Sequence, residues 1–221
     1  ITGHQTRDLL CVPLLGPRGV LGVIEIINRR SDVPFTPDDR ALLVSVLGPF
    51  VAGIHTAAST CVLALHVLSR HPVLLARIQS EVDAAFAEGP PSVEGLKSLV
   101  TLRYALMETL RRYPITAAIQ RTLDRDLRFE GYDLPAGQLL TIGTSAAHFL
   151  ERFYAEPERF DVERYTSGRE EHLARGAYAP FGIGPHRCLG ASLGELQMLV
   201  VLATLLHKLE FAPAAEAAPR M

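Results

Sequence analysis

Residues 181–190 read FGIGPHRCLG and are the most informative part of the sequence. Glycines at positions 182, 184 and 190 let the backbone turn tightly, because no Cβ stands in the way. Cys188 stands where a helix is expected to begin, so backbone N–H groups and the positive end of the helix dipole favour its thiolate form. The stretch therefore predicts a tight, glycine-rich loop that carries one cysteine in its anionic form.

The same stretch resembles the cysteine-ligand loop of the cytochromes P450, the haem-thiolate monooxygenases, whose pattern is F-G-x-G-x-[HR]-x-C-x-G. The resemblance implies that the protein holds haem b (iron protoporphyrin IX), with Cys188 as the ligand of its iron. It also implies that Phe181, Gly182, Gly184 and Gly190 form the cofactor site. A thiolate ligand pushes electron density onto iron and favours O–O cleavage. The alternative is a buried, inert cysteine in a glycine-rich turn.

Glu108 and Arg111 lie three residues apart in a segment that predicts a helix over 102–113. An exposed pair at this spacing contributes only about 0.2–0.5 kcal/mol, so it means little alone. In the P450 family, however, an E-x-x-R pair is joined by an arginine from a downstream PERF-like segment and locks the cysteine loop. By resemblance this arginine is Arg164 in FDVERY, with Arg159 in PERF as the second candidate. We expect such a buried triad to specify geometry more than to add stability.

Residues 52–56, AGIHT, resemble the family's oxygen-activation motif, [AG]-G-x-[DE]-T, on the helix that crosses the distal face of the haem. Thr56 is the predicted catalytic proton relay, and its hydroxyl is expected to bond the carbonyl of Ala52, four residues back. His55 replaces the family's acid. It is either a proton shuttle near neutral pH or an inert polar residue.

Two cations are candidates to meet the haem propionates, because a buried carboxylate needs an ionic or hydrogen-bonding partner. His186 occupies the family's propionate position, two residues before the cysteine. Arg121, at the head of the first strand after the E-x-x-R helix, is either a second propionate partner or a solvated strand-edge residue. Five further histidines show no metal-ligand spacing and are expected at the surface or in capping positions: His66, His71, His148, His172 and His207.

The rest of the chain predicts a mainly α fold with small β-sheets. Helices are expected over 50–70, 72–87, 102–113 and 191–209, and short strands between 120 and 143. Residues 3–57 instead predict a β-hairpin and a helix that begins at Thr36, and they resemble the C-terminal half of a GAF domain, a small-ligand sensor module. We predict a partial GAF-like segment over 1–48 and a truncated P450-like haem-binding region over 49–221.

Composition excludes several classes of protein. The 221 residues are 48% hydrophobic with a net charge of −2, which excludes disorder and gives no argument for nucleic acid as a partner. Residues 41–69 contain no charged side chain, but Gly48-Pro49 and scattered polar residues favour a buried helix over a membrane span. Three widely spaced cysteines encode no disulfide framework, so a reducing cytoplasm is the expected compartment.

Two functions of different classes remain open. The first is a haem-thiolate monooxygenase, incomplete as this chain, that takes electrons from a ferredoxin or flavoprotein reductase and inserts one oxygen atom into a small apolar substrate. The P450 likeness covers about residues 49–213, the haem-proximal half of that family's chain. The second is a non-catalytic haem- or small-ligand-binding sensor module, which explains the first 50 or so residues better. A rearranged coding fragment that cannot fold stably is the third possibility.

Overall fold

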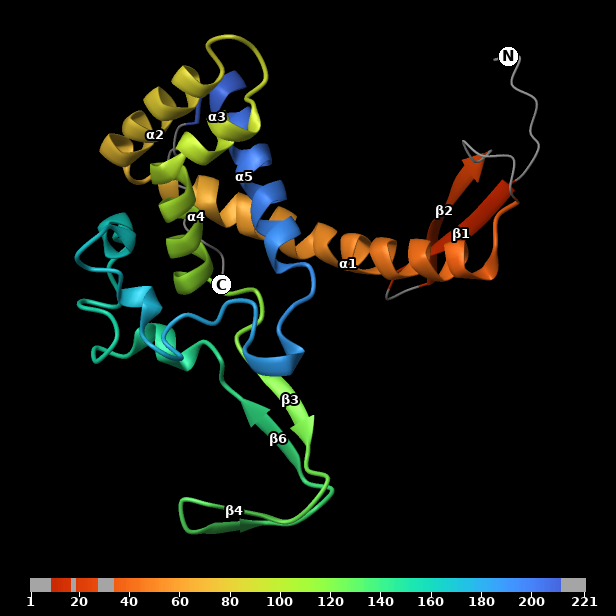
Figure 1. Ribbon diagram of the computed structural model, residues 1–221. Helices are drawn as coiled ribbons and strands as arrows, with labels where there is room; N and C mark the ends of the chain where they lie inside the picture. The colour runs from red at the N-terminus through yellow and green to blue at the C-terminus, as the bar shows by residue number, and fades with distance from the viewer. Residues whose placement is uncertain (1–8, 17–18, 28–33, 212–221) are drawn as a thin grey trace. The chain divides into compact units, whose positions relative to one another are not determined.

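The computed structural model describes residues 9–16, 19–27 and 34–211. The chain divides into two compact units, Ile1–Thr56 and Ala57–Met221. This division falls inside a helix, whereas the predicted domain boundary after residue 48 stays a prediction. Figure 1 shows the order of the elements, which are described below unit by unit.

The first unit begins with the predicted hairpin. Strand β1 (Leu9–Gly16) pairs antiparallel with β2 (Gly19–Ile27), and the register shifts between Leu14 and Leu15. The sequence Gly16-Pro17-Arg18-Gly19 predicts the turn between the two strands, and its central residues 17 and 18 lie outside the described residues. The hairpin itself is confirmed.

Helix α1 (Pro37–Leu68) starts as the sequence predicts. The Thr36 hydroxyl accepts a hydrogen bond from the Asp39 N–H (3.3 Å), and the Asp39 carboxylate accepts one from the Thr36 N–H (2.7 Å). This reciprocal pair is a capping box, and Pro37 at the first helical position needs no intrahelical partner.

The prediction that a new helix starts at residue 50, after a break at Gly48-Pro49, is wrong, because α1 continues through these residues as one helix. An internal proline removes a single N–H and crowds the preceding turn, which costs roughly 3 kcal/mol. Good helix formers such as Leu42, Leu43 and Ala52 lie on both sides of the break, and we attribute the continuation to them. Within the described residues, no single helix has the length and apolarity of a membrane span; Gly53–Leu68 and Pro72–Ala85 meet that test only together, and they are bent by 119°.

The core of the second unit lies where three helices meet the end of α1: α2 (Pro72–Ala85), α4 (Val100–Arg112) and α5 (Ala191–Lys208). Figure 1 shows α2, α4 and α5 gathered around this region. Leu68, Ile78, Leu102 and Leu202 are at most 1% exposed and fill the centre. The predicted boundaries of α2, α4 and α5 lie within two residues of the observed ones, and so does the predicted end of α1.

The sequence did not predict one short α-helix of this unit. Helix α3 (Val93–Ser98) is capped by the hydroxyl of Ser92, which accepts a hydrogen bond from the Gly95 N–H at 3.1 Å. Six residues are too few to show a 3.6-residue hydrophobic period, so only the cap could have indicated it.

Two small sheets follow α4, as predicted. Strand β3 (Ile119–Thr122) pairs with β6 (Leu139–Ile142), and β4 (Leu127–Phe129) pairs with β5 (Tyr132–Leu134). The chain then runs to α5 through loops and four short 3-10 helices: η1 (Ala146–Phe149), η2 (Val162–Tyr165), η3 (Glu171–Leu173) and η4 (Gly184–His186). These loops carry most of the candidate site.

Candidate active site

The cysteine loop, residues 181–190, is closed by one backbone hydrogen bond. The Cys188 N–H donates to the Phe181 carbonyl at 2.8 Å. Inside the loop, Gly182 (φ +75°) and Gly184 (φ +70°) occupy the left-handed region, which side chains other than glycine rarely adopt. The backbone conformation therefore explains two of the three glycines that the sequence singled out.

The thiol of Cys188 is exposed, which argues against the inert buried cysteine. The Cys188 carbonyl accepts a hydrogen bond from the N–H of Ala191 (3.3 Å), the first residue of α5, so the thiol stands at the entry to that helix. Gly190 has an ordinary φ of −85°, and a Cβ there would lie 3.9 Å from the Cys188 sulfur. Its lack of a side chain leaves one side of the sulfur open.

Apolar side chains that follow Cys188 in the sequence are also exposed. Leu189 is 86% exposed, and Leu193, Leu196 and Val200 form a stripe on α5 with exposures of 49%, 49% and 38%. Large apolar side chains left in water usually mark a surface that takes a ligand or a partner. An exposed thiol beside apolar surface, on a loop with open glycine positions, fits a planar apolar macrocycle whose metal binds sulfur.

The two predicted propionate partners are placed differently. His186 is exposed at the end of η4, two residues before the cysteine. Arg121 is half-buried on β3, and its guanidinium donates to the carbonyl of Gln120 at 2.7 Å. Their role toward a cofactor stays a prediction.

Thr56 and His55 are exposed on α1. The Thr56 hydroxyl donates to the carbonyl of Gly53, three residues back, at 3.0 Å. The predicted bond to the carbonyl of Ala52 stays a prediction. These two residues end the first unit and Cys188 belongs to the second, so their catalytic roles are taken up below as proposals.

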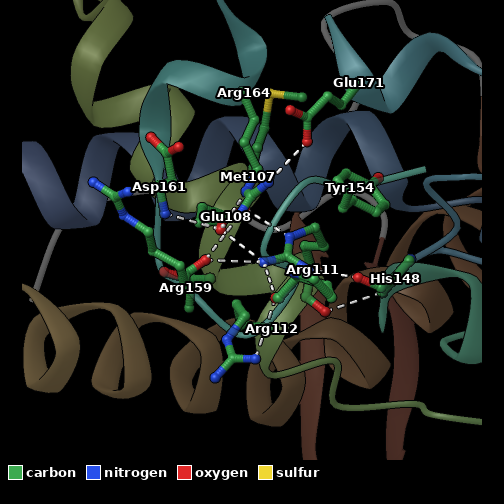
Figure 2. A network of polar contacts seen from close by, with 12 residues as sticks. Met107, Glu108, Arg111, Arg112, His148, Tyr154, Arg159, Asp161, Arg164 and Glu171 are labelled. Carbon is green, nitrogen blue, oxygen red and sulfur yellow. Dashed lines mark hydrogen bonds and ion pairs between the residues drawn. The ribbon is translucent and has the colours of Figure 1, made fainter. Parts of the chain in front are cut away.

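The structure brings Glu108, Arg111 and Arg164 together in the interior (Figure 2), and all three side chains are fully buried. Arg111 binds both carboxylate oxygens of Glu108 at 2.8 Å, and Arg164 Nε donates to Glu108 Oε1 at 3.2 Å. Burial is the largest single effect on Arg111 and works against its charge, but the hydrogen bonds to Glu108 and the electrostatic attraction of that carboxylate and of two nearby tyrosines together outweigh it and raise the pKa of the guanidinium. The cationic form of Arg111 is therefore favoured in the interior.

The structure also decides between the two downstream arginines. The Arg159 side chain is 64% exposed and pairs with Glu156 at 3.5 Å. Among the described residues, Arg159 contacts the buried cluster through its backbone carbonyl, which accepts hydrogen bonds from Arg111 (3.3 Å) and Arg164 (3.1 Å). Arg164 is thus the arginine that joins the E-x-x-R pair.

Glu171 is a member of this cluster that sequence reasoning missed. Two buried arginines against one buried glutamate would leave one positive charge uncompensated, which is costly in a low-dielectric interior. Glu171, whose side chain is 14% exposed, lies 2.8 Å from Arg164 and supplies the second negative charge. The charge count alone could have indicated that a further carboxylate was needed. We call Glu108, Arg111, Arg164 and Glu171 the charge cluster.

We expect Glu171→Gln to lower the free energy of unfolding by about 2–3 kcal/mol, somewhat below the usual cost of breaking a fully buried pair, because Glu171 keeps some solvent contact. Urea unfolding followed by circular dichroism measures this loss. Glu163→Gln is the matched control: Glu163 also binds an arginine at 2.7 Å, Arg77, but both side chains are about half exposed. Its loss should stay below about 1 kcal/mol. Equal losses in the two variants would contradict a buried role for Glu171.

The prediction that His148 lies at the surface or in a capping position is wrong. The side chain is fully buried, since it lies between α4 and the segment that precedes the cysteine loop. Its spacing to other histidines carried no signal, because its two partners are backbone groups. Within the described residues, no three histidine, cysteine or acidic side chains gather as a metal site would require.

Comparison with known proteins agrees with this geometry. The family model described as "Cytochrome P450" matches residues 23–221. The chain belongs to the cytochrome P450 family. Membership implies a haem iron cofactor, and the mainly helical fold with small sheets is that of part of a P450.

Several curated relatives of this P450 chain are enzymes. It is 33% identical over 80% of its length to cyclooctat-9-en-7-ol 5-monooxygenase of Streptomyces melanosporofaciens, and 33% identical over 88% to sterol 14alpha-demethylase of Mycolicibacterium vanbaalenii. It is 32% identical over 88% of its length to the mitochondrial cholesterol side-chain cleavage enzyme of Hypanus americanus. The chain spans 38%, 43% and 37% of these three relatives, respectively.

Proposed function

We propose that this chain carries the haem-binding part of a haem-thiolate monooxygenase that inserts one oxygen atom from O2 into an apolar organic substrate. The observation that carries the proposal is the exposed thiol of Cys188, presented by a glycine-bearing loop at the entry to α5. Family membership supplies the reaction class. When bound, a haem with a thiolate ligand supplies activation of dioxygen.

The residues of the cofactor site would act as follows. Cys188 would bind the iron of haem b, while His186 and Arg121 would pair with its propionates. Phe181 is partly buried against the core and would fix the start of the loop. The exposed apolar stripe on α5 would be covered by apolar parts of the holoenzyme and thereby kept from water.

Substrate and electron donor follow from the relatives only as proposals. Two relatives are named for a sterol and for cholesterol, and a third for cyclooctat-9-en-7-ol. We propose a polycyclic or terpenoid substrate of similar apolar character. Electrons would come from a ferredoxin or a flavoprotein reductase.

Haem titration of the chain tests the cofactor assignment. Saturable binding and, after reduction under carbon monoxide, a Soret band at the position typical of a thiolate ligand would support it. Absence of saturable binding at any haem concentration would overturn it. Product formation with a reductase and an apolar substrate then tests the reaction class.

Thr56 is the residue proposed to relay protons, with His55 beside it. Thr56→Ala removes the hydroxyl and is expected to lower product formed per oxygen consumed by about 100-fold, the scale of positioned proton transfer. Thr56→Ser keeps the hydroxyl and should retain most of the yield, and both variants should bind haem like the parent. An unchanged yield in Thr56→Ala would remove Thr56 from the mechanism.

A second candidate function is a haem- or small-ligand-binding sensor that does not oxygenate substrates. The observation that favours it is the β1–β2 hairpin followed by a capped helix, the arrangement expected if residues 3–57 are the C-terminal half of a GAF-like unit. Haem binding with the thiolate-type band, combined with no product under any reductase, would favour this candidate over the monooxygenase.

A further inference from the structure

His148 makes hydrogen bonds to two segments that are far apart in the sequence. Its ring nitrogen Nδ1 lies 3.0 Å from the carbonyl oxygen of Arg111, at the C-terminal end of α4. Its other ring nitrogen, Nε2, accepts a hydrogen bond from the N–H of Ala179 at 2.9 Å. Figure 2 shows the ring beside Arg111, away from the Arg164 side of the charge cluster.

The chemistry of the two partners determines the state of the ring. A backbone N–H only donates, so Nε2 must be unprotonated; a backbone carbonyl only accepts, so Nδ1 must carry the hydrogen. The neutral Nδ1–H tautomer is the one form that satisfies both bonds. In return, the Arg111 guanidinium donates to the carbonyl of His148, so residue 148 is bound to Arg111 in both directions.

From Ala179 the hydrogen bonds continue into the cysteine loop. The Ala179 carbonyl accepts from the Gly182 N–H at 3.0 Å, and the Phe181 carbonyl accepts from the Cys188 N–H at 2.8 Å. Two tyrosines hold the same segment: Tyr154 donates to the Ala177 carbonyl and Tyr178 to the Met107 carbonyl, both at 3.2 Å. Among the described contacts, His148 is the side chain that binds the backbone nearest to Phe181.

We propose that His148 is a positioning residue for Cys188, which couples the charge cluster to the cysteine loop through its neutral ring. This inference rests on the proposed function only in so far as the loop holds the haem. The hydrogen bonds themselves are properties of the chain without cofactor.

The proposal carries a pH dependence. The charged groups that face His148 are Arg111 and Glu108 of α4, and the ring of Tyr178 stacks on it at 5.8 Å. Burial lowers the pKa of His148, an effect that the charge of Arg111 reinforces and that the Arg111 carbonyl and Glu108 only partly oppose. Protonation would place an N–H on Nε2 against the N–H of Ala179 and remove that bond.

Proton linkage gives the direction in which the folding stability changes with pH. With the native pKa below the ordinary value of about 6.5, the unfolded chain binds the proton first, so stability is complete above about pH 6.5 and falls as the pH decreases. Between about pH 6.5 and the native pKa, proton binding by His148 in the unfolded chain lowers the folding equilibrium constant by up to tenfold per pH unit. Once the pH falls below the native pKa, the Ala179 bond is lost in the folded state as well.

Two variants and one control test the coupling. His148→Leu removes both hydrogen bonds, whereas His148→Gln keeps a donor and an acceptor but cannot take up a proton. His172→Gln is the control, because His172 also has a pKa lowered by burial, but its Nδ1 is buried without a partner among the described groups. Amide hydrogen exchange of the chain without haem, followed at Ala179, Gly182 and Cys188 between pH 7 and pH 5, is the primary measurement.

After correction for the intrinsic pH dependence of exchange, we expect the wild type to lose protection at these amides as the pH falls. His148→Leu should lose at least tenfold of its protection already at pH 7, and His148→Gln should keep most of it with a flat profile. Nitrogen-15 shifts of the His148 ring should report the Nδ1–H tautomer at pH 7. His172→Gln should behave as the wild type.

An acid-dependent loss of the same size in His148→Gln, or wild-type protection in His148→Leu, would overturn the proposal. If His148→Leu does not fold, the comparison of amide protection in His148→Gln and in the wild type across the pH range still tests the proposal. In the haem-loaded chain, the fraction with a thiolate-type Soret band should follow the same order. Failure of the wild type to bind haem, with the exchange pattern intact, would remove the proposed function and leave the coupling standing.

Discussion

Cys188→Ser is expected to abolish the thiolate-type Soret band of the reduced carbon monoxide complex. A serine hydroxyl has nearly the shape of the thiol, but it does not ionise near neutral pH and is a poor ligand for haem iron. Because Cys188 is exposed, we expect the stability of the chain to change by no more than about 0.5 kcal/mol. Absorption spectra after haem titration and reduction provide the measurement, and thermal unfolding verifies that the variant is folded.

Cys61 provides the matched control. Its side chain is buried in the helical core, and burial raises the pKa of the Cys61 thiol to about 11. Such a thiol is a packing group, so Cys61→Ala should keep the thiolate-type band while losing some stability. Retention of the band in Cys188→Ser, or its loss in a folded Cys61→Ala, would place the metal ligand elsewhere in the chain.

Glu108→Gln is expected to have the largest effect on the fold. The Glu108 carboxylate accepts hydrogen bonds from Arg111, Arg164, the Tyr165 hydroxyl (2.8 Å) and the Asp161 N–H (3.0 Å). The amide removes the negative charge shared by two buried arginines and turns one acceptor into a donor. Removing one partner of a buried ion pair costs about 3–5 kcal/mol. Proteins of this size have about 5–15 kcal/mol in total, so partial unfolding follows.

Urea unfolding measures the loss, and near-ultraviolet circular dichroism reports on the aromatic side chains around the charge cluster. Glu158→Gln is the control, since Glu158 binds Arg112 but its own side chain is 77% exposed. This change should cost less than about 1 kcal/mol. A Glu108→Gln protein as stable as Glu158→Gln would mean that the buried charges are compensated by other groups.

Local patterns predicted much of the architecture because their causes are local. The capping box at Thr36, the hairpin turn and the proline and glycine residues that end helices act within a few residues of the chain. Hydrophobic spacing places α4 within two residues of its observed ends. The break at Gly48-Pro49 failed because a local penalty competes with the stability of a helix that is 32 residues long.

In the candidate site, too, residues that belong to local sequence patterns were predicted, whereas residues defined by long-range contacts were not. Sequence alone identified the cysteine loop and the E-x-x-R pair, since a rare combination of residue types at defined spacings carries that information, whereas family resemblance only favoured Arg164 over Arg159. Glu171 and His148 were missed because their importance lies in what they contact. Glu171 matters through a charge on Arg164, and His148 through backbone groups of Arg111 and Ala179.

The residues alone predicted the tight glycine loop that carries Cys188 and the capped start of α1, because glycine positions and helix caps are properties of neighbouring residues. Only the tertiary structure decided which arginine joins Glu108, which carboxylate balances the second guanidinium, and which histidine is buried. Those choices depend on desolvation and on through-space charge balance, and both arise only when segments tens of residues apart are brought together.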